Sequence, residues 1–333
     1  MNAVKLVSVQ GENKLVNDST YSKPEIKKES QVLVKVKAVA VNPIDLQMFQ
    51  GKNEARIMSS DILGRELTGV IEKTGNKVKN FKKGDEVFLA VGSMGSNGAF
   101  AGYVVVSEEI LAHKPKELSF EQITALPIAY VTAWQAVSRL QLPKESSVLI
   151  LGASGSVGKA LINVLHHFGY HKIIATAGND YSMGELMKQG LSKEQIVSYK
   201  QPDLDRIILT QNNGLYDIVI DCIGGKMTET GANSLRREGL FVDITNLRTE
   251  EANYILFQKA AIIMNIARYA EPELHFKYGE ILNQVSFILG SEENWHLQEV
   301  LNLGKLSAEN LMTAFNLMEE NKTHGKKLVL EME

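Results

Sequence analysis

The amino-acid sequence predicts an α/β fold in two parts, a small β-barrel or rolled sheet followed by a doubly wound parallel sheet. The first third of the chain contains short β-prone segments separated by turn signals, whereas from about residue 121 helical segments alternate with continuous apolar runs. The run 147–151 also leads directly into glycines at three-residue spacing. A chain of 333 residues is too long for one ordinary core, so we expect two domains.

The strands expected in the first part are short and follow one another closely. They are 4–7, 32–39, 69–72, 86–89 and 102–106. Turn signals at 74–76 (Thr-Gly-Asn) and 83–85 (Lys-Gly-Asp) lie between the third and the fourth of them. The glycine-rich stretch 92–98 is either a lid over a cleft or an ordinary hairpin loop.

The second part contains apolar runs without alternation, which are typical of a parallel sheet covered on both faces. After the run that ends at residue 151, the expected strands are 172–176, 195–197, 217–222, 239–244 and 261–266. Right-handed crossovers between them give a doubly wound sheet. The tail from about residue 270 contains two helical stretches and a final strand, 327–330, which we expect to return to the first part.

Residues 147–158 are the most informative stretch of the chain. A β-prone run ends at Gly152. Two further glycines, Gly155 and Gly158, follow it, and a helical apolar pattern then begins. In this context a glycine backbone approaches a pyrophosphate without an interfering Cβ, and the N–H groups at the helix start point at the phosphates. We interpret the stretch as a dinucleotide-binding turn.

Composition excludes several classes of function. The formal net charge is −3 and no long basic run occurs, which argues against nucleic acid as a partner. Cys222 is the single cysteine, so the chain has no internal disulfide and no Cys-rich zinc lobe. No signal pattern or long uncharged apolar segment is present, so we expect a cytoplasmic protein without a membrane partner.

Several dispersed motifs resemble those of the zinc-free quinone oxidoreductases of the medium-chain dehydrogenase/reductase superfamily. They are VNPID at 41–45, LGRELTGV at 63–70, FKKGDEV at 81–87, ALP and TAW at 125–127 and 132–134, and NKTHGKKLVL at 321–330. The resemblance implies a GroES-like catalytic domain over 1–120, a Rossmann NADP-binding domain over 121–267 and a C-terminal segment, 268–333, that returns to the catalytic domain. It also implies a homodimer, with strand 261–266 as the sheet edge that pairs across subunits.

The positions that bind zinc in other members of this superfamily are altered here. Those members use a cysteine in the first motif and a His-Glu pair in the second, which correspond to Asn42 and to Arg65 with Glu66. An amide is a poor zinc ligand and a guanidinium is none. Three histidines, at 166, 167 and 171, lie on or just after one expected helix and point in different directions, which indicates a solvated face. We therefore expect no metal.

The sequence favours NADPH over NADH. NAD-specific sites place an acidic residue at the end of the second strand. Here Ala177, Gly178 and Asn179 stand at that strand end, and Asp180 follows only after them. Tyr199-Lys200 resembles the family position beside the adenosine phosphate, with which Lys200 could pair. The alternative is that Asp180 holds NADH and Lys200 is merely solvated.

Three residues are expected in catalysis, all in positioning roles. Asn42 either donates a hydrogen bond to substrate or cofactor or opens an Asn-Pro turn. Asp45 either orients Asn42 or the nicotinamide ribose, or caps a helix. Thr132 resembles the family residue near the nicotinamide.

Two further positions leave questions open. The family often has a tyrosine two residues beyond Asp45, where this chain has Gln47, so the sequence names no proton donor. Arg65 either binds an anionic substrate or pairs with Glu66.

The expected cofactor-binding residues lie in the glycine turn and at strand ends. They are Thr132, Ser154, Gly155, Ser156, Val157, Ala177, Asn179, Tyr199, Lys200, Cys222, Ile223, Thr245 and Asn246. Ser156 and Val157 are expected to act through their backbone N–H groups. Cys222 is expected to be a small buried group rather than a nucleophile.

The chemistry that fits these residues is hydride transfer to an activated acceptor. Oxidising an alcohol needs a Lewis acid or a base, and neither is evident in the sequence. A quinone or an α,β-unsaturated carbonyl carries its own electron sink, so the protein supplies orientation and hydrogen-bond donors. We expect an NADPH-dependent, zinc-independent reductase of such a small molecule. The alternatives are an alcohol or aldehyde dehydrogenase with an unrecognised site, and a non-catalytic NADPH-binding or sensor protein.

Overall fold

The computed structural model describes residues 1–332 apart from 53–57, 59, 92–97, 267–277 and 292–295. The chain forms two compact units. Unit 1 comprises Met1–Val131, Tyr269–Glu293 and Leu297–Glu333, and unit 2 comprises Thr132–Arg268 with Asn294–His296. The domain boundaries expected after residues 120 and 267 stay predictions. The stretch 92–98, expected as a lid or a hairpin, lies outside the described residues except for Gly98.

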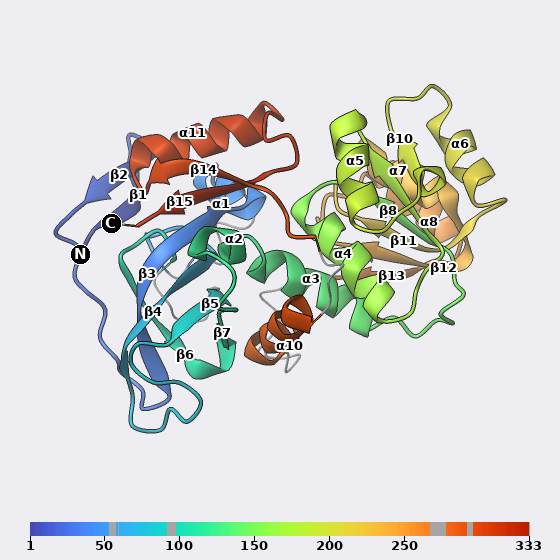
Figure 1. Cartoon of the computed structure of the whole chain (residues 1–333). Coiled ribbons are helices and arrows are strands. Elements are labelled where there is room, and N and C mark those ends of the chain that lie inside the picture. The colour runs from blue at the N-terminus through green and yellow to red at the C-terminus, as the bar shows by residue number, and fades with distance from the viewer. Residues whose placement is uncertain (53–57, 59, 92–97, 267–277, 292–295, 333) are drawn as a thin grey trace. The chain divides into compact units, whose positions relative to one another are not determined.

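Unit 2 is built on a six-stranded parallel sheet in the order β10-β9-β8-β11-β12-β13 (Figure 1). The strands are β8 (Val148–Leu151), β9 (Ile173–Ala177), β10 (Ile196–Ser198), β11 (Tyr216–Asp221), β12 (Leu235–Asp243) and β13 (Ile262–Asn265). The chain starts in the middle of the sheet, winds to one edge and returns to build the other half. This is the doubly wound topology that the apolar runs predict.

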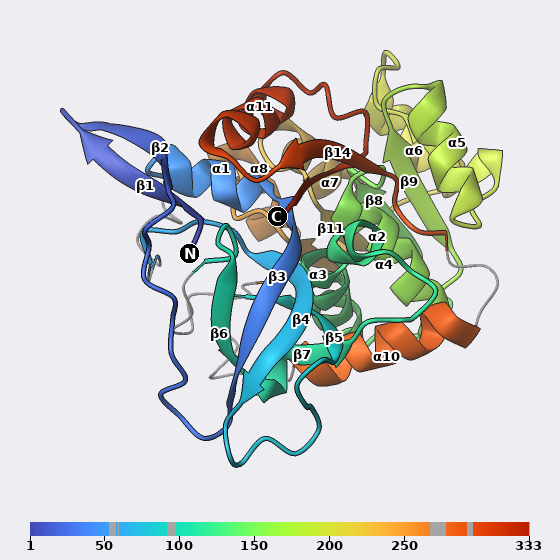
Figure 2. The same cartoon turned by 60° about the vertical axis from the view of Figure 1, so that its left-hand side comes forward.

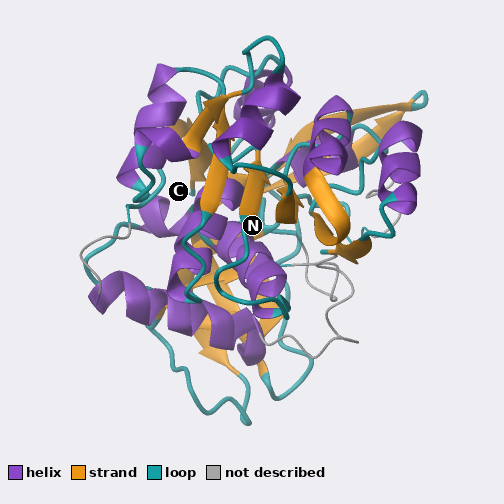
Figure 3. Cartoon of the chain, turned by 90° about the vertical axis from the view of Figure 1, so that its right-hand side faces the viewer, coloured by secondary structure: helices purple, strands orange, loops and turns teal. Residues whose placement is uncertain are grey.

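Helices alternate with these strands, as Figure 3 shows by colour. They are α4 (Ser156–His167), α5 (Asp180–Lys188), α6 (Leu204–Gln211), α7 (Lys226–Ser234) and α8 (Glu250–Gln258), with the short 3-10 helix η3 (Lys193–Gln195) before β10. The helix α3 (Pro127–Ser138) precedes them and begins in unit 1. The strands β8, β9 and β11 are buried along nearly their whole length because helices cover both faces of the sheet.

Unit 1 is centred on a sheet with the path β14-β15-β3-β4-β5-β7, and β6 pairs with β3 (Figure 2). The strands are β3 (Gln31–Val41), β4 (Glu66–Thr74), β5 (Glu86–Ala90), β6 (Tyr103–Ser107), β7 (Leu111–His113), β14 (Val300–Lys305) and β15 (Lys327–Glu331). A separate hairpin consists of β1 (Ala3–Val9) and β2 (Glu12–Asp18). The helices are α1 (Pro43–Phe49), α2 (Phe120–Thr124), η2 (Glu108–Ile110), α10 (Tyr278–Ser291) and α11 (Ala308–Glu319).

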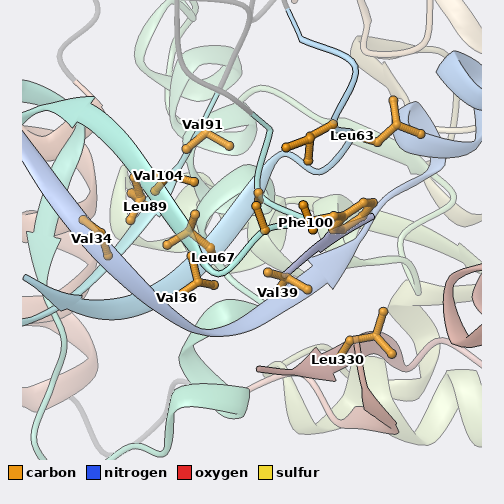
Figure 4. Close-up of a cluster of buried hydrophobic side chains, with 14 of the residues drawn as sticks. Val34, Val36, Val39, Leu63, Leu67, Leu89, Val91, Phe100, Val104 and Leu330 are labelled. Atoms are coloured by element: carbon orange, nitrogen blue, oxygen red, sulfur yellow. The ribbon is translucent and has the colours of Figure 1, made fainter. Parts of the chain in front are cut away.

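The core of unit 1 gathers side chains from strands that are far apart in the sequence. Figure 4 shows Val36 and Val39 of β3 with Leu67 of β4, Leu89 of β5 and Leu330 of β15. All five are buried. The last strand of the chain is therefore part of the first core, and its antiparallel pairing with β3 sets Leu328 opposite Val41.

The predicted mixed α/β architecture is confirmed, and so is the return of strand 327–330 to the first part of the chain. Three strands were not predicted. Most residues of β2 are polar or charged, and β7 has only three residues. The strand β14 lies in the tail, for which the sequence predicts helical stretches before the final strand. Among the described residues, no helix is long and apolar enough to span a bilayer.

Candidate functional site

The glycine turn after β8 contains three glycines with different physical roles. Gly152 has φ +78°, and a Cβ there would lie 2.6 Å from the Ile223 side chain. A Cβ on Gly158 would lie 2.4 Å from the Ala153 Cα. Both glycines are therefore required by the packing of the turn itself.

Gly155 is different because the fold does not need it to be a glycine. Its φ is −76°, and the nearest atom to a Cβ at this position would be the Gly152 carbonyl oxygen at 3.5 Å, an ordinary contact. The residue is exposed and is the N-cap of α4, whose first N–H groups have no partners inside the helix. A glycine that packing does not require leaves the helix start open to close approach by a ligand. The turn thus fits the pyrophosphate of a dinucleotide.

The second strand of the sheet holds this turn in place. The backbone N–H of Gly152 donates to the Thr176 hydroxyl at 3.0 Å, and that hydroxyl donates to the Ile150 carbonyl at 3.4 Å. Thr176 lies in β9 and is fully buried. Its hydroxyl therefore links the carboxyl ends of β8 and β9.

Asp221, at the carboxyl end of β11, organises the loop that follows it. One carboxylate oxygen accepts from the backbone N–H groups of Ile223 and Gly224 at 2.8 and 2.9 Å, and the other accepts from the Thr228 hydroxyl at 2.7 Å. This arrangement places Ile223 over Gly152, as the close approach of the two residues shows. The loop after β11 and the glycine turn are thus packed together at the sheet edge where ligands of such folds bind.

Asp243 plays the same role at the end of β12. Its Oδ1 accepts from the backbone N–H groups of Thr245 and Asn246, both at 2.9 Å, and its Oδ2 forms an ion pair with Arg248. The guanidinium of Arg248 also donates to the Asn265 side chain at 2.9 Å. The carboxyl edges of β12 and β13 are therefore joined by one buried acid and one arginine.

Cys222 follows Asp221 and remains a thiol. Burial raises the pKa of its thiol well above the usual range, and the negative charges of Asp221 and Asp243 raise it further. A thiol that does not ionise is a poor nucleophile. The residue is half-buried, and its expected role as a small buried group stays a prediction.

The end of β9 carries the residues expected to contact the adenosine. The Tyr199 backbone N–H donates to the Ala177 carbonyl at 3.0 Å, and the Tyr199 hydroxyl would lie 2.2 Å from a Cβ on Gly178. The Asn179 side chain caps α5 by accepting from the Ser182 N–H at 2.8 Å. Lys200 is exposed. Tyr199 and Lys200 thus stand beside the strand end, whereas the Asn179 side chain already has a structural role.

Unit 1 contains a closed ring of polar side chains, hereafter the 42–66–327 ring. The Lys327 ammonium donates to Asn42 Oδ1 at 2.6 Å and lies 2.5 Å from Glu66 Oε1. The Asn42 amide nitrogen donates to the same Glu66 oxygen at 2.9 Å. Asn42 and Lys327 are each 5% exposed and Glu66 is fully buried. The other Glu66 oxygen accepts from the Ile128 backbone N–H at 2.8 Å, in the first turn of α3.

Asp45 supports this ring through the backbone. One of its oxygens accepts from the Asn42 N–H at 2.8 Å and the other from the Gly64 N–H at 3.2 Å. Burial raises the pKa of its carboxyl to about 6, although the nearby Arg65 charge and the Asn42 hydrogen bond act to lower it. Arg65 is itself buried, and its guanidinium approaches the Met48 sulfur at 3.0 Å. Asp45 therefore anchors the Asn42 backbone, and the Asn42 side chain faces the Asp45 backbone in return, so the two residues form a capping box at the start of α1.

The residues at the superfamily's zinc-binding positions do not fit a metal ion. Asn42 offers only an amide, Arg65 is a cation, and the one carboxylate, Glu66, is already paired with the Lys327 ammonium. In the part of the chain that the structure describes, no three His, Cys, Asp or Glu residues lie close enough to hold a metal. The rings of His166 and His171 do stack, with centroids 5.4 Å apart, which helix periodicity did not predict, while His167 packs on Trp134.

The predicted residues fall into two groups, one in each unit. Unit 2 brings together the glycine turn, Thr176 and the ends of β11 and β12, and it includes Thr132, which is buried in α3. Unit 1 brings together Asn42, Asp45 and Arg65.

Four residues of these groups were not predicted to have the roles they play. Glu66 and Lys327 lie inside family motifs, but neither was expected in a ring with Asn42, and the roles of Asp221 and Asp243 were missed. Two sequence signals could have pointed to these roles. They are a lysine at the start of an apolar strand, as at Lys327, and an aspartate at the end of one, as at Asp221 and Asp243.

Comparison with known proteins agrees with this architecture. Residues 28–116 match the family described as "Alcohol dehydrogenase GroES-like domain", and residues 156–273 match "Zinc-binding dehydrogenase". An NADPH-dependent alkenal/one oxidoreductase of Arabidopsis thaliana is 31% identical over 74% of this chain, and the aligned part spans 64% of that protein, just under two thirds. A 2-methylene-furan-3-one reductase of Solanum lycopersicum is 27% identical over 94% of this chain and 74% of its own length.

Solved structures share the fold over the whole chain. The quinone oxidoreductase from Coxiella burnetii is 26% identical, with a TM-score of 0.81 over 100% of this chain and 99% of its own. The two family matches lie in the same order as the two sheets described above, and the relatives are oxidoreductases. The chain belongs to the medium-chain dehydrogenase/reductase superfamily.

Proposed function

We propose that the protein is an NADPH-dependent, zinc-independent reductase that transfers hydride to a quinone or an α,β-unsaturated carbonyl. The observation that carries the proposal is the 42–66–327 ring, which places the Lys327 cation on Glu66, while a second cation, Arg65, stands at the neighbouring metal-ligand position. A site with this chemistry suits an acceptor that needs hydrogen-bond donors rather than a Lewis acid. The names of the Arabidopsis, tomato and Coxiella relatives support the same class of acceptor.

The cofactor is held by unit 2 in this proposal. The backbone N–H groups of Ser156 and Val157 bind the pyrophosphate in front of Gly155, with Ser154 alongside. Ala177, Tyr199 and Lys200 bind the adenosine phosphate, because the strand end carries no acid and Lys200 can pair with a phosphate. The loops that Asp221 and Asp243 organise, with Cys222, Ile223, Thr245 and Asn246, line the nicotinamide end. The bound NADPH supplies the hydride.

The polar groups of unit 1 serve the acceptor. The ring gives Asn42 one fixed orientation, so its remaining amide hydrogen is held ready for a carbonyl oxygen on which negative charge develops. Asp45 fixes the backbone from which that amide projects. Thr132 is proposed to position the nicotinamide. None of these groups has to move a proton in order to assist hydride transfer.

The test is cofactor oxidation at 340 nm with NADPH and with NADH, each with 9,10-phenanthrenequinone and with a simple enone, in the presence and absence of a chelator. We expect turnover with NADPH that the chelator does not change. Oxidation of a simple alcohol by NADP⁺ that stops when chelator is added would point to a dehydrogenase instead. Tight NADPH binding without turnover on either acceptor would point to a binding or sensor protein.

We also propose a homodimer joined at β13. This edge strand exposes Ile262 and Ile263, and Phe257 of α8 is 84% exposed nearby in sequence. An exposed apolar edge strand is a ready template for pairing with a second copy. Light scattering after size exclusion should give about twice the chain mass for the wild type, while I263K should give the monomer. A monomeric wild type at micromolar concentration contradicts the proposal. The cytoplasmic location stays a proposal that cell fractionation tests.

A further inference from the structure

The 42–66–327 ring fixes which end of the Asn42 amide is the oxygen and which is the nitrogen. An isolated asparagine could adopt either of these two orientations. Lys327 has only hydrogens to donate and an ionised Glu66 has only lone pairs to offer. The contact of Lys327 with one end of the Asn42 amide and of Glu66 with the other therefore decides which end is oxygen and which is nitrogen. One amide hydrogen of Asn42 remains for another partner, because Lys327 and the capping box at the start of α1 already use the Asn42 oxygen.

The charges around the ring balance without any added ion. Glu66 and Asp45 are the acids, and Lys327 and Arg65 are the bases, all four of them at most 8% exposed. A divalent cation placed beside Glu66 would meet the Lys327 ammonium 2.5 Å from the same oxygen. Two buried cations that share one carboxylate oxygen repel strongly because little water screens them. The position between Asn42 and Glu66 is already occupied by the chain's own cation.

Strand pairing brings Lys327 to this position. Lys327 is the first residue of β15, and the next residue, Leu328, is paired with Val41 at the end of β3. Asn42 follows Val41 directly, so the antiparallel register sets residue 327 beside residue 42. The lysine is thus fixed by backbone hydrogen bonds on one side and by Asn42 and Glu66 on the other.

We propose that Lys327 is a positioning residue that takes the place of a metal ion in this site. It neutralises Glu66 and, together with Glu66, holds the Asn42 amide so that its remaining hydrogen is presented to the acceptor's carbonyl oxygen. The inference rests on the proposed function, because the acceptor is the one named there. It adds a residue from the last strand of the chain, Lys327, to the groups on which the reaction depends.

Two double variants separate this role from a purely structural one. K327M/E66Q removes both charges of the pair together, so that no uncompensated charge is left buried. N42D/E66Q exchanges the amide and the acid, so the ring keeps its net charge and Lys327 keeps an anionic neighbour, but position 42 no longer has a hydrogen to donate. In both, the glutamine introduced at position 66 can still accept from the Ile128 N–H. NADPH dissociation constants, measured by fluorescence, should stay within about threefold of wild type because unit 2 binds the cofactor.

Steady-state kinetics with saturating NADPH and a quinone give the first readout. We expect kcat to fall at least about thirtyfold in both variants, with a smaller change in KM, because the amide bond to the carbonyl oxygen strengthens as charge develops. K327R, which keeps the charge and donors, should recover part of the loss. Wild-type kcat in a folded K327M/E66Q overturns the inference. If that variant does not fold, wild-type kcat in N42D/E66Q overturns it equally.

The second readout does not depend on activity. In ¹⁵N-labelled protein, the Asn42 side-chain NH₂ pair is identified by its absence in N42D/E66Q, and its exchange with solvent is measured. We expect slow exchange in the wild type and fast exchange in K327M/E66Q. Fast exchange in the wild type overturns the inference whether or not the enzyme turns over. A wild type that is inactive on quinones and enones but shows a slowly exchanging amide contradicts only the proposed function.

Discussion

The hydroxyl of Thr176 accepts the backbone N–H of Gly152 at 3.0 Å, so the second strand of the parallel sheet holds the first glycine of the turn that leaves the central strand. Gly152 has a positive φ, and the Ile223 side chain packs where its Cβ would stand. The Thr176 hydroxyl, which is fully buried, therefore helps to fix the geometry of the turn.

Replacing Thr176 with valine keeps the shape of the side chain and removes only the hydroxyl. A buried N–H without a partner costs about 1–3 kcal/mol, and we expect T176V to weaken NADPH binding about tenfold by loosening the turn. T176S keeps the hydroxyl and should bind within about threefold of wild type. Titration of NADPH fluorescence measures both, and equal affinities for T176V and wild type would contradict the role of the clamp.

Gly155 and Gly158 make a matched pair for the cofactor site. G155A should fold with a loss of about 1 kcal/mol or less, since an N-cap Gly-to-Ala change is mild, yet its methyl group should raise the NADPH dissociation constant at least about tenfold. G158A places a Cβ 2.4 Å from the Ala153 Cα, so it should lose about 1–3 kcal/mol of stability by overpacking. Urea unfolding and NADPH titration of both variants test whether Gly155 serves cofactor binding and Gly158 serves stability. A G155A variant that binds NADPH normally is the contrary result.

The buried Asp45 makes stability depend on pH in a defined direction. Its folded pKa of about 6 exceeds the ordinary value of 3.8, so the protonated form is favoured in the folded state. Its stabilising contribution is complete below about pH 4 and is lost as the pH rises through about 6. The free energy of unfolding of wild type relative to D45N should fall by about 2 kcal/mol between about pH 4.5 and 7.5. Urea unfolding at several pH values measures it, and parallel curves for the two proteins would refute it.

Cys222 should be slow to react with thiol reagents. Because burial and two neighbouring aspartates raise the pKa of its thiol, little thiolate exists at about pH 8. We expect reaction with 5,5′-dithiobis(2-nitrobenzoate) to be at least about tenfold slower in the native protein than in concentrated guanidinium chloride, where the single thiol serves as its own control. Equal rates would mean that the thiol is exposed in solution.

Much of the fold was predictable because it rests on local patterns. The strands β8, β9 and β11 contain apolar stretches without alternation, which are typical of a buried parallel strand, and the glycine turn lies directly after β8. By contrast, β2 reads ENKLVND, with too few apolar positions to signal a strand, and it forms because β1 pairs with it along its full length. Pairing partners of this kind do not appear in a single segment of sequence.

The candidate site was likewise predictable only in part. The glycine turn could be interpreted as a cofactor site from its spacing and from the strand and helix beside it, but the ring of unit 1 joins residues 285 positions apart in the chain. Nothing near Lys327 in the sequence marks it as a partner of Asn42, because only the register of β15 on β3 sets the two side by side. The side chain of Asn179, which was expected to contact the cofactor, also caps α5, a role that the sequence analysis did not predict.

The same separation of 285 residues determines how long Asn42 waits for Lys327 during synthesis of the chain. At about 5–20 residues per second, a ribosome needs roughly 15–60 s to travel from Asn42 to Lys327. Until Lys327 is made, the nascent chain carries Glu66 without its counter-charge and β3 without its last neighbour, whereas unit 2 is complete, nearly all of it as one continuous stretch, before β15 is made. The second unit can therefore finish folding first, and the unit that begins the chain is the last to be completed.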